Sequence, residues 1–356
     1  MKIKIIHTLF LLGLFVSLNA QSDIQRIAQI VQQKVNEEQF SGTVLVAKDG
    51  APIYHESFGW KDDDKSAIDN HTQYCIASIT KMLTAIVTLQ LVEEQKLKLE
   101  DNLALLLPQL EIPKAKKITL HHLLLHISGL PNENDLMYLK KKSPEAFIKA
   151  VLSQRTKSPA LGSFNYNNLD YMLLGLIIEK QSGKSWEENI QDRIIKPLEL
   201  ENTGFLSKGA YPQNYAWPYQ INAQGKAKKD PAFHIENFYA AGNMYSNTMD
   251  LLKIDQALYG EQLLSEKSKA LMFKSYPEYN YTGYSVWTYR YPFVANPPSI
   301  MERRGGILGA NVVLIRLLDS QESIIILSNN DRFNPDSFGD KSNLREALII
   351  ALSENK

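Results

Sequence analysis

The sequence of 356 residues has little cysteine, no surplus of either charge and few long apolar runs. Cys75 is the only cysteine, so no disulfide forms within the chain and the fold depends on its apolar core. Basic and acidic side chains number 39 each, so no charge surplus points to nucleic acid or to an acidic membrane surface. Hydrophobic residues make up 44% of the chain, which is enough to build a core in a chain of this length.

The most pronounced apolar run lies at the N-terminus, where it has the pattern of a secretory signal peptide. Lys2 and Lys4 precede a mostly apolar run over residues 5–16, and small residues follow. This run is shorter than the ~20 residues that a membrane-spanning helix needs. We therefore expect a signal peptide over residues 1–20, export of the mature protein to the periplasm or the extracellular space, and no stable membrane insertion after cleavage.

Strand-like segments lie near both ends of the chain, and helix-like segments fill its middle. The β-prone segments are residues 42–47, 52–59, 282–289, 310–318 and 323–327, and helical patterns recur over 24–35, 80–99, 120–126, 144–152, 169–181, 249–258 and 342–352. This order predicts an α+β fold, with an antiparallel sheet formed from both chain ends, flanking helices and an inserted, mostly helical lobe. We place the α/β lobe at about residues 21–65 and 272–356 and the helical lobe at about 66–271, with a site expected between them.

A serine and a lysine at the start of the helix expected over residues 80–99 form an S-x-x-K pattern. The G-x-S-x-G of a nucleophile elbow is absent from the sequence. The spacing of Ser78 and Lys81 puts their side chains on one helix face, one turn apart. A serine needs a base to take its proton, and burial makes a lysine a better base because it disfavours the charged form. The alternative is that Ser78 only caps the helix and Lys81 faces water.

Tyr166 and Asn168 form a Y-x-N pattern just before the helix expected over residues 169–181. A neighbouring cation would stabilise the phenolate and make the tyrosine an effective base. The amide of Asn168 would enter the same cleft. The alternative is an aromatic packing residue followed by a helix-capping asparagine.

Arg304, Gly305, Gly306 and Ile307 come directly before the next strand-like segment. Glycines at a strand edge let a substrate approach the backbone closely, and a free N–H there would join that of Ser78 in an oxyanion hole. The guanidinium of Arg304 matches the geometry of a substrate carboxylate. The alternative is a bulge or a hairpin turn.

Taken together and in this order, the three motifs resemble those of the penicillin-recognising serine hydrolases, in particular class C β-lactamases, D,D-peptidases and related esterases. The resemblance covers nearly the whole mature chain, and further similar segments are residues 120–131, 173–183, 197–198, 203–205 and 241–251. It implies a serine β-lactamase or penicillin-binding-protein-like fold and an acyl-enzyme mechanism. The implied partner is a small-molecule or peptide substrate with an amide or ester bond, such as a D-Ala-type peptide, a β-lactam or a small ester. No metal or organic cofactor is implied, and the oligomeric state is left open.

The same resemblance implies a role for each residue of the motifs. Ser78 would be acylated, and Lys81 would assist its deprotonation. Tyr166 would pass the proton to the leaving group and activate water for deacylation. Asn168 would bind Lys81 and the substrate amide, and the N–H groups of Ser78 and Ile307 would hold the oxyanion. Which of Lys81 and Tyr166 is the acylation base stays open, because two coupled groups share one titration.

One position departs from the family pattern, because its members usually carry lysine or histidine where this chain has Arg304. Arginine keeps the charge and can still bind a carboxylate, but it cannot release its proton. This difference favours a peptidase or an esterase over an efficient β-lactamase. It also supports an alternative, a catalytically silent member of the same fold that binds a cell-wall peptide or a protein partner.

Other candidate residues have simpler explanations. His122 and His126 have a spacing that can bind zinc on a helix, but leucines lie between them in place of the catalytic glutamate, so we expect a structural pair and no metal site. Cys75 is expected to be a small buried apolar residue. The aromatic segment over residues 211–219 is expected to line or cover the cleft.

Overall fold

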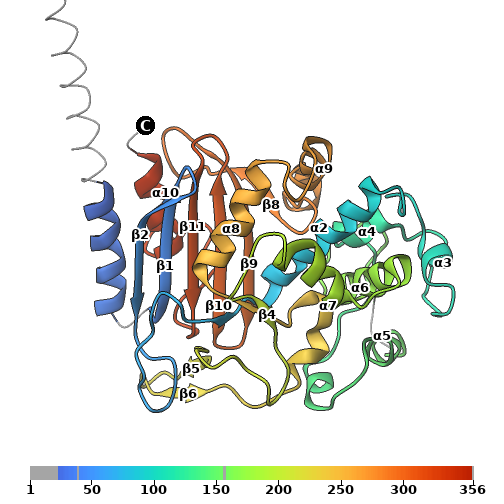
Figure 1. Cartoon of the computed structure of the whole chain (residues 1–356), viewed down its shortest axis with the longest axis horizontal. Coiled ribbons are helices and arrows are strands. Elements are labelled where there is room, and N and C mark those ends of the chain that lie inside the picture. The colour runs from blue at the N-terminus through green and yellow to red at the C-terminus, as the bar shows by residue number, and fades with distance from the viewer. Residues whose placement is uncertain (1–22, 38–39, 155–157, 355–356) are drawn as a thin grey trace, which may run out of the picture.

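The computed structural model describes residues 23–37, 40–154 and 158–354, and it confirms the α+β fold. A six-stranded antiparallel sheet has the order β2-β1-β11-β10-β9-β8 (Figure 1). Its strands are β1 (Gly42–Lys48), β2 (Ala51–Phe58), β8 (Trp287–Arg290), β9 (Ser299–Ile307), β10 (Ala310–Leu317) and β11 (Glu322–Ser328). The two ends of the chain meet where β1 pairs with β11, from Gly42 opposite Ser328 to Lys48 opposite Glu322. Both chain ends therefore build the sheet, as expected.

Helices cover both faces of this sheet. The helix over residues 23–36 and α10 (Leu344–Ser353) pack on one face, and α8 (Thr248–Tyr259) crosses the other (Figure 1). Side chains alternate between the two faces, so Ile326 of β11 packs in the first layer and Leu327 in the second. Because both layers are apolar, strands such as β11 are buried at every position.

The middle of the chain forms the helical lobe. At its centre α2 (Thr80–Glu93) packs against α6 (Leu169–Ser182), and both helices are buried on most of their circumference. The other α-helices are α3 (Leu103–Leu106), α4 (Leu120–Leu124), α5 (Pro144–Leu152), α7 (Trp186–Ile190) and α9 (Glu266–Met272). One apolar cluster runs from Leu45 in the sheet to Phe147 in α5, so the sheet and the helical lobe share a core.

The remaining elements are short. These are the 3-10 helices η1 (Ala77–Ile79), η2 (Asp135–Leu139), η4 (Ile235–Ala241) and η5 (Pro277–Tyr279), the π-helical turn η3 (Gln191–Ile195), and the strands β3 (Tyr74–Cys75), β4 (Gly204–Phe205), β5 (Tyr219–Ile221), β6 (Ala227–Lys229) and β7 (Met244–Ser246). The η1 turn, which directly precedes α2, lies against β9 and β10. This contact holds the start of α2 at the junction of the sheet and the helical lobe.

Several expected elements have different ends, and β9 was not expected as a strand. The helix expected over residues 80–99 ends at Glu93, and the strand expected over 282–289 is confined to Trp287–Arg290. The segment 304–307, which we placed before a strand, forms the end of β9. Its glycines have low strand propensity, and burial on both sides removes the alternation that would reveal a strand.

The expected signal peptide over residues 1–20 lies outside the described residues and stays a prediction. The lobe boundaries, at about residues 21–65 and 272–356 against 66–271, also stay a proposal. Among the helices in the described ranges, none is long and apolar enough to cross a membrane.

Candidate active site

The structure brings Ser78, Lys81 and Asn168 together. The Lys81 amine is fully buried and donates to Ser78 Oγ at 3.0 Å. It also donates to Asn168 Oδ1 at 2.6 Å and to the carbonyl oxygen of Ala241 at 2.9 Å. Three acceptors therefore fix the lysine amine directly beside the serine hydroxyl, as the S-x-x-K spacing predicted.

The backbone around Ser78 has two special positions. Ala77 has a φ of 44°, in the left-handed region that residues with a side chain seldom adopt and that is often found at functional sites. Gly305 of β9 lies so near that a Cβ there would be 2.6 Å from Ile76 O and 3.1 Å from Ser78 N. Only glycine permits this approach of the sheet to the serine.

The phenol of Tyr166 lies beside an arginine that the sequence analysis did not single out. Arg303 is 1% exposed and donates through Nη2 to Tyr166 Oη and through Nε to the carbonyl oxygen of Ser78, each at 2.7 Å. Lys81 Nζ is 5.0 Å from the centre of the Tyr166 ring. Tyr166 therefore lies beside two basic side chains and close to Ser78.

These basic groups change the acidity of the tyrosine. Burial opposes ionisation of the phenol, but the Arg303 guanidinium and the Lys81 ammonium outweigh it and lower the pKa of Tyr166 to about 8. Burial lowers the pKa of Lys81, and although Tyr166 acts in the opposite direction, Arg303 adds to the lowering. Both groups lose a proton more readily than in water, which suits a general base.

Arg304 does not join this cluster, contrary to our expectation that it would bind a substrate carboxylate. Successive side chains of a strand point to opposite faces, so Arg304 and Arg303 face different layers. Arg304 pairs with Glu302 and, at 2.8 Å, with Asp336. The buried Glu302 also pairs with Arg345 of α10. Arg304 therefore belongs to an ion network on the far face, and Arg303 has the place beside the serine.

The amide of Asn168 is held at both ends. Its Oδ1 accepts from Lys81, and its Nδ2 donates to Glu133. The same carboxylate oxygen of Glu133 accepts a hydrogen bond from Tyr138 Oη at 2.8 Å. Glu133 therefore orients the amide with its oxygen toward the lysine. Sequence reasoning missed Glu133, and the available signal was its position two residues beyond the similar segment 120–131.

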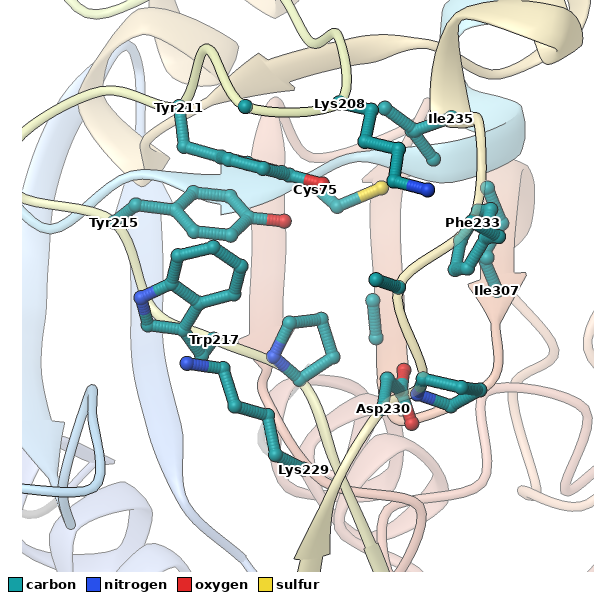
Figure 2. Close-up of a pocket in the computed structure, with 15 residues that line it drawn as sticks. Cys75, Lys208, Tyr211, Tyr215, Trp217, Lys229, Asp230, Phe233, Ile235 and Ile307 are labelled. Atoms are coloured by element: carbon teal, nitrogen blue, oxygen red, sulfur yellow. The ribbon is translucent and has the colours of Figure 1, made fainter. Parts of the chain in front are cut away.

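Two cavities adjoin these residues. One, of about 410 Å³, is lined in part by Asn168, Gly306 and Ile307. The other, of about 360 Å³, shares the side chain of Ile307 and is shown in Figure 2. Its aromatic wall consists of Tyr211, Tyr215 and Trp217, whose ring centroids are 4.5–5.3 Å apart. The segment 211–219 therefore lines a cavity next to the candidate site, as expected.

In the part of the chain that the structure describes, neither the histidine pair nor the cysteine forms a hydrogen bond with the side chain of Ser78, Lys81 or Tyr166. His122 caps the start of α4, and His126 is buried with its ring centroid 4.4 Å from that of Tyr166. Across the described ranges, no group of histidine, cysteine and acidic residues could hold a metal ion. Burial raises the pKa of Cys75 to about 12, so its thiol stays protonated near neutral pH.

The fold and the site together define a serine hydrolase of the penicillin-recognising type, with a serine, a buried lysine and a tyrosine where the sheet meets a helical lobe. Residues 27–349 match the family described as Beta-lactamase. Since this match covers most of the sequence, the chain belongs to that family.

Curated relatives are similar along most of their length. The putative penicillin-binding protein PbpX of Bacillus subtilis is 30% identical over 86% of this chain and 74% of its own length. The teichoic acid D-alanine hydrolase of Staphylococcus aureus is 26% identical over 83% of this chain and 71% of its own length.

Solved structures confirm the fold. An octameric penicillin-binding protein homologue from Pyrococcus abyssi matches with a TM-score of 0.79 and 24% identity, over 92% of this chain and 77% of that one. The D-amino acid amidase from Ochrobactrum anthropi SV3 matches with a TM-score of 0.78 and 22% identity, over 95% of this chain and 99% of that one.

Proposed function

We propose that the protein hydrolyses an amide or ester substrate through an acyl-enzyme on Ser78. One observation carries this proposal. The buried Lys81 amine donates to Ser78 Oγ at 3.0 Å, beside a tyrosine whose pKa is lowered to about 8. A serine hydroxyl in contact with such a pair has the base that it needs to become a nucleophile.

In acylation, Ser78 Oγ attacks the substrate carbonyl carbon and forms the new O–C bond. The serine proton passes to the pair of Lys81 and Tyr166, and the pair returns a proton to the leaving amine or alcohol as its bond to carbon breaks. For deacylation, the same pair takes a proton from the attacking water and returns one to Ser78 as the ester bond breaks. Lys81 and Tyr166 act here as one coupled unit.

The strand pairing favours the N–H groups of Ser78 and Gly306 for the oxyanion hole. Ile307 pairs with Ala310 across a two-residue turn, and in such hairpins the pair that flanks the turn ordinarily exchanges backbone hydrogen bonds. The N–H of Ile307 then faces β10, and the alternation turns the N–H of Gly306 toward the opposite edge. Since β8 pairs only with the first part of β9, this edge is open, and we prefer Gly306 to Ile307 for the role.

Arg303 acts in this proposal as a fixed positive charge. It cannot release its proton, so it supports the reaction electrostatically by stabilising the Tyr166 phenolate. The backbone carbonyl of Ser78 accepts its second hydrogen bond, which ties the charge to the turn that carries the nucleophile.

The relatives support the substrate class and the place of action. Proteins named as penicillin-binding proteins and as a teichoic acid D-alanine hydrolase are among those similar to this chain. We therefore propose a D-Ala-type peptide, a β-lactam or a small ester as substrate. With the signal peptide expected over residues 1–20, we propose that the protein acts in the periplasm or outside the cell.

The test is hydrolysis of p-nitrophenyl acetate and of a penicillin by the mature protein and by Ser78→Ala. We expect release of p-nitrophenol by the parent and a return to the background rate in Ser78→Ala. The exposed Ser163 provides a matched control, and Ser163→Ala should keep the parental rate. Turnover that survives in Ser78→Ala would contradict the proposal, and a parent inactive on both substrates would favour a silent binding protein.

A further inference from the structure

A fully buried carboxyl lies behind the tyrosine of the candidate active site. Asp170, in the first turn of α6, is 0% exposed. Its Oδ1 accepts from the hydroxyl of Ser128 at 2.6 Å, and its Oδ2 accepts from the side-chain amide of Asn167 at 3.1 Å. The proposed acylation and deacylation steps do not use this carboxyl.

Among the described residues, no lysine or arginine forms an ion pair with Asp170. Its nearest basic partner is His126, whose Nδ1 lies 3.5 Å from Asp170 Oδ2. The amine of Lys81 donates to three other acceptors. A carboxylate without a paired cation is costly to bury, and such a group ordinarily takes up a proton.

The ring of His126 gives a second reason for a proton on this carboxyl. The backbone N–H of Asn167 points at His126 Nδ1, with the two nitrogen atoms 3.4 Å apart. A backbone N–H only donates, so Nδ1 is the unprotonated nitrogen of the ring. His126 Nδ1 and Asp170 Oδ2 would then be two acceptors that face each other, unless the carboxyl carries the proton between them.

The acidities of the two groups agree with this geometry. Burial raises the pKa of Asp170 to about 8, although its hydrogen bonds and the charge of Lys81 act in the opposite direction. The first turn of a helix also favours a carboxylate, but it offers less than the hydration that complete burial removes. Burial lowers the pKa of His126 well below its usual range, and Lys81 and Arg303 add to the lowering. Both groups are therefore mainly neutral at pH 7.

This neutral pair contacts Tyr166. The ring centroid of His126 is 4.4 Å from that of Tyr166 and 5.0 Å from that of Tyr171. Asn167, the next residue after Tyr166, is hydrogen-bonded to both members of the pair. An ionised carboxyl at this place would oppose the Tyr166 phenolate, because like charges repel strongly where water is excluded.

We propose that Asp170 is a positioning residue that acts as a neutral carboxylic acid. Its proton faces His126 Nδ1, the His126 ring holds the phenol of Tyr166 in place, and the missing charge leaves the phenolate unopposed. The titratable and charged groups around this carboxyl come from four parts of the chain, and they are Lys81, His126, Tyr166, Tyr171 and Arg303. This inference rests on the proposed acyl-enzyme function, in which Tyr166 shares the proton with Lys81.

Infrared spectroscopy of the whole protein tests the protonation state without any turnover. In protein made with isotope-labelled aspartate, we expect a band of a protonated carboxyl at pH 7 that shifts with the label and is absent from Asp170→Asn. The matched control is Asp192→Asn, which should remove no such band, because hydrogen bonds from Lys184 and Lys196 lower the pKa of Asp192 to about 2. If Asp170→Asn loses no protonated band either, Asp170 is ionised and the proposal is overturned.

The pH profile of p-nitrophenyl acetate hydrolysis tests the role of the carboxyl. Asparagine is neutral and keeps a donor and an acceptor, so Asp170→Asn should keep kcat/KM within about threefold and leave its inflection in place. Asp170→Leu leaves the polar partners unsatisfied and should lower kcat/KM by about tenfold. If Asp170 were ionised, its replacement by asparagine would remove an anion and move the inflection downward, since the pKa of both Tyr166 and Lys81 would fall. Such a downward shift, or a parental rate in Asp170→Leu, would contradict the proposal.

Glu133→Gln shows whether the profile responds to the loss of an anion. Burial lowers the pKa of Lys81, and the carboxylate of Glu133 acts against this lowering. Its removal should therefore move the inflection downward.

The failure of this inference can be told apart from the failure of the proposed function. Ester turnover that depends on Ser78, together with a downward shift in Asp170→Asn, would overturn only the role of Asp170. A parent without ester turnover would overturn the proposed function and the role of Asp170 with it.

Discussion

Two neighbouring arginines on β9 have different hydrogen-bond partners on opposite faces of the sheet, although both guanidinium groups lie within 5.2 Å of the centre of the Trp287 ring. Arg303 contacts Tyr166 and the backbone of Ser78 on the face of the helical lobe. Arg304 lies on the other face, in an ion network with Glu302 and Asp336. The residue type and the strand are the same, and only the alternation of side chains separates the two arginines. A position in a motif is therefore not enough to assign a role, because the face of the strand decides which layer the side chain enters.

The comparison predicts that the Arg304 face carries stability and the Arg303 face carries activity. The largest effect is expected for Glu302→Gln, because Glu302 is fully buried and pairs with both Arg304 and Arg345. Its loss takes the shared carboxylate away from Arg345 and Arg304, which keep Glu346 and Asp336. This costs about 3–5 kcal/mol of unfolding free energy, because Arg345 is fully buried. Denaturant unfolding measures this change, and Asp336→Asn, at an exposed partner, should cost less than about 1 kcal/mol. Equal effects of the two variants would refute the assignment of the network.

Arg303→Gln is expected to have the next largest effect, this time on catalysis. It removes the guanidinium that stabilises the Tyr166 phenolate and should lower kcat/KM by about 10²-fold, the scale of a general-base contribution. Arg304→Gln should lower kcat/KM far less, by less than about fivefold, or below about 1 kcal/mol of activation free energy, because its side chain faces the other layer. Steady-state hydrolysis of p-nitrophenyl acetate measures both, and similar losses in the two variants would remove the distinction between the faces.

The pH dependence of kcat/KM should also distinguish Arg303 from Arg304. The proton acceptors must be deprotonated to act, so kcat/KM should rise with pH through an inflection near 8, the lowered pKa of Tyr166. Arg303 lowers the pKa of both Tyr166 and Lys81, so Arg303→Gln should move the inflection upward, by about one pH unit. Arg304→Gln should leave it in place. An inflection that stays at the parental pH in Arg303→Gln would show that Arg303 does not set the acidity of the pair.

Gly305 and Gly306 follow the two arginines and also face opposite sides of the sheet, so a substitution at each should affect activity differently, although the effects are smaller. A Cβ on Gly305 would come within 2.6 Å of Ile76 O, whereas a Cβ on Gly306 would be no nearer than 3.3 Å to the side chain of Asn311. Gly305→Ala should therefore push β9 away from Ser78 and lower kcat/KM by about tenfold, which is less than the ~10²-fold that a misplacement of ~1 Å can cost. Gly306→Ala keeps the backbone N–H, and its kcat/KM should fall distinctly less than that of Gly305→Ala. A larger loss in Gly306→Ala than in Gly305→Ala would reverse the assignment of the faces.

Much of the fold could be predicted from the sequence, because local signals agreed with the final arrangement. The turn at Asp49 and Gly50 joins β1 to β2 through positive φ angles, and Asp-Gly is a pair of residues that favours such two-residue hairpin turns. Gly183, with a φ of 73°, ends α6 in the left-handed conformation in which a glycine commonly closes a helix. The S-x-x-K spacing placed Ser78 and Lys81 in contact, since it depends only on helix geometry.

The missed features depend on tertiary structure. Burial on both faces of the sheet removed the period of two that would have separated Arg303 from Arg304. Glu133 lies in a loop, 35 residues before Asn168, and no local pattern relates the two. The pKa of Tyr166 likewise depends on Arg303, which the chain brings near from a separation of 137 residues.

The central claim is that Ser78 forms a covalent acyl-enzyme, and intact-mass spectrometry with peptide mapping tests it most directly. The mature protein is mixed with a labelled penicillin and is quenched at increasing times. We predict a mass increase equal to one penicillin, mapped to the peptide that contains Ser78 and absent from Ser78→Ala. A stable adduct on any other residue, or an equal adduct in Ser78→Ala, would contradict the account.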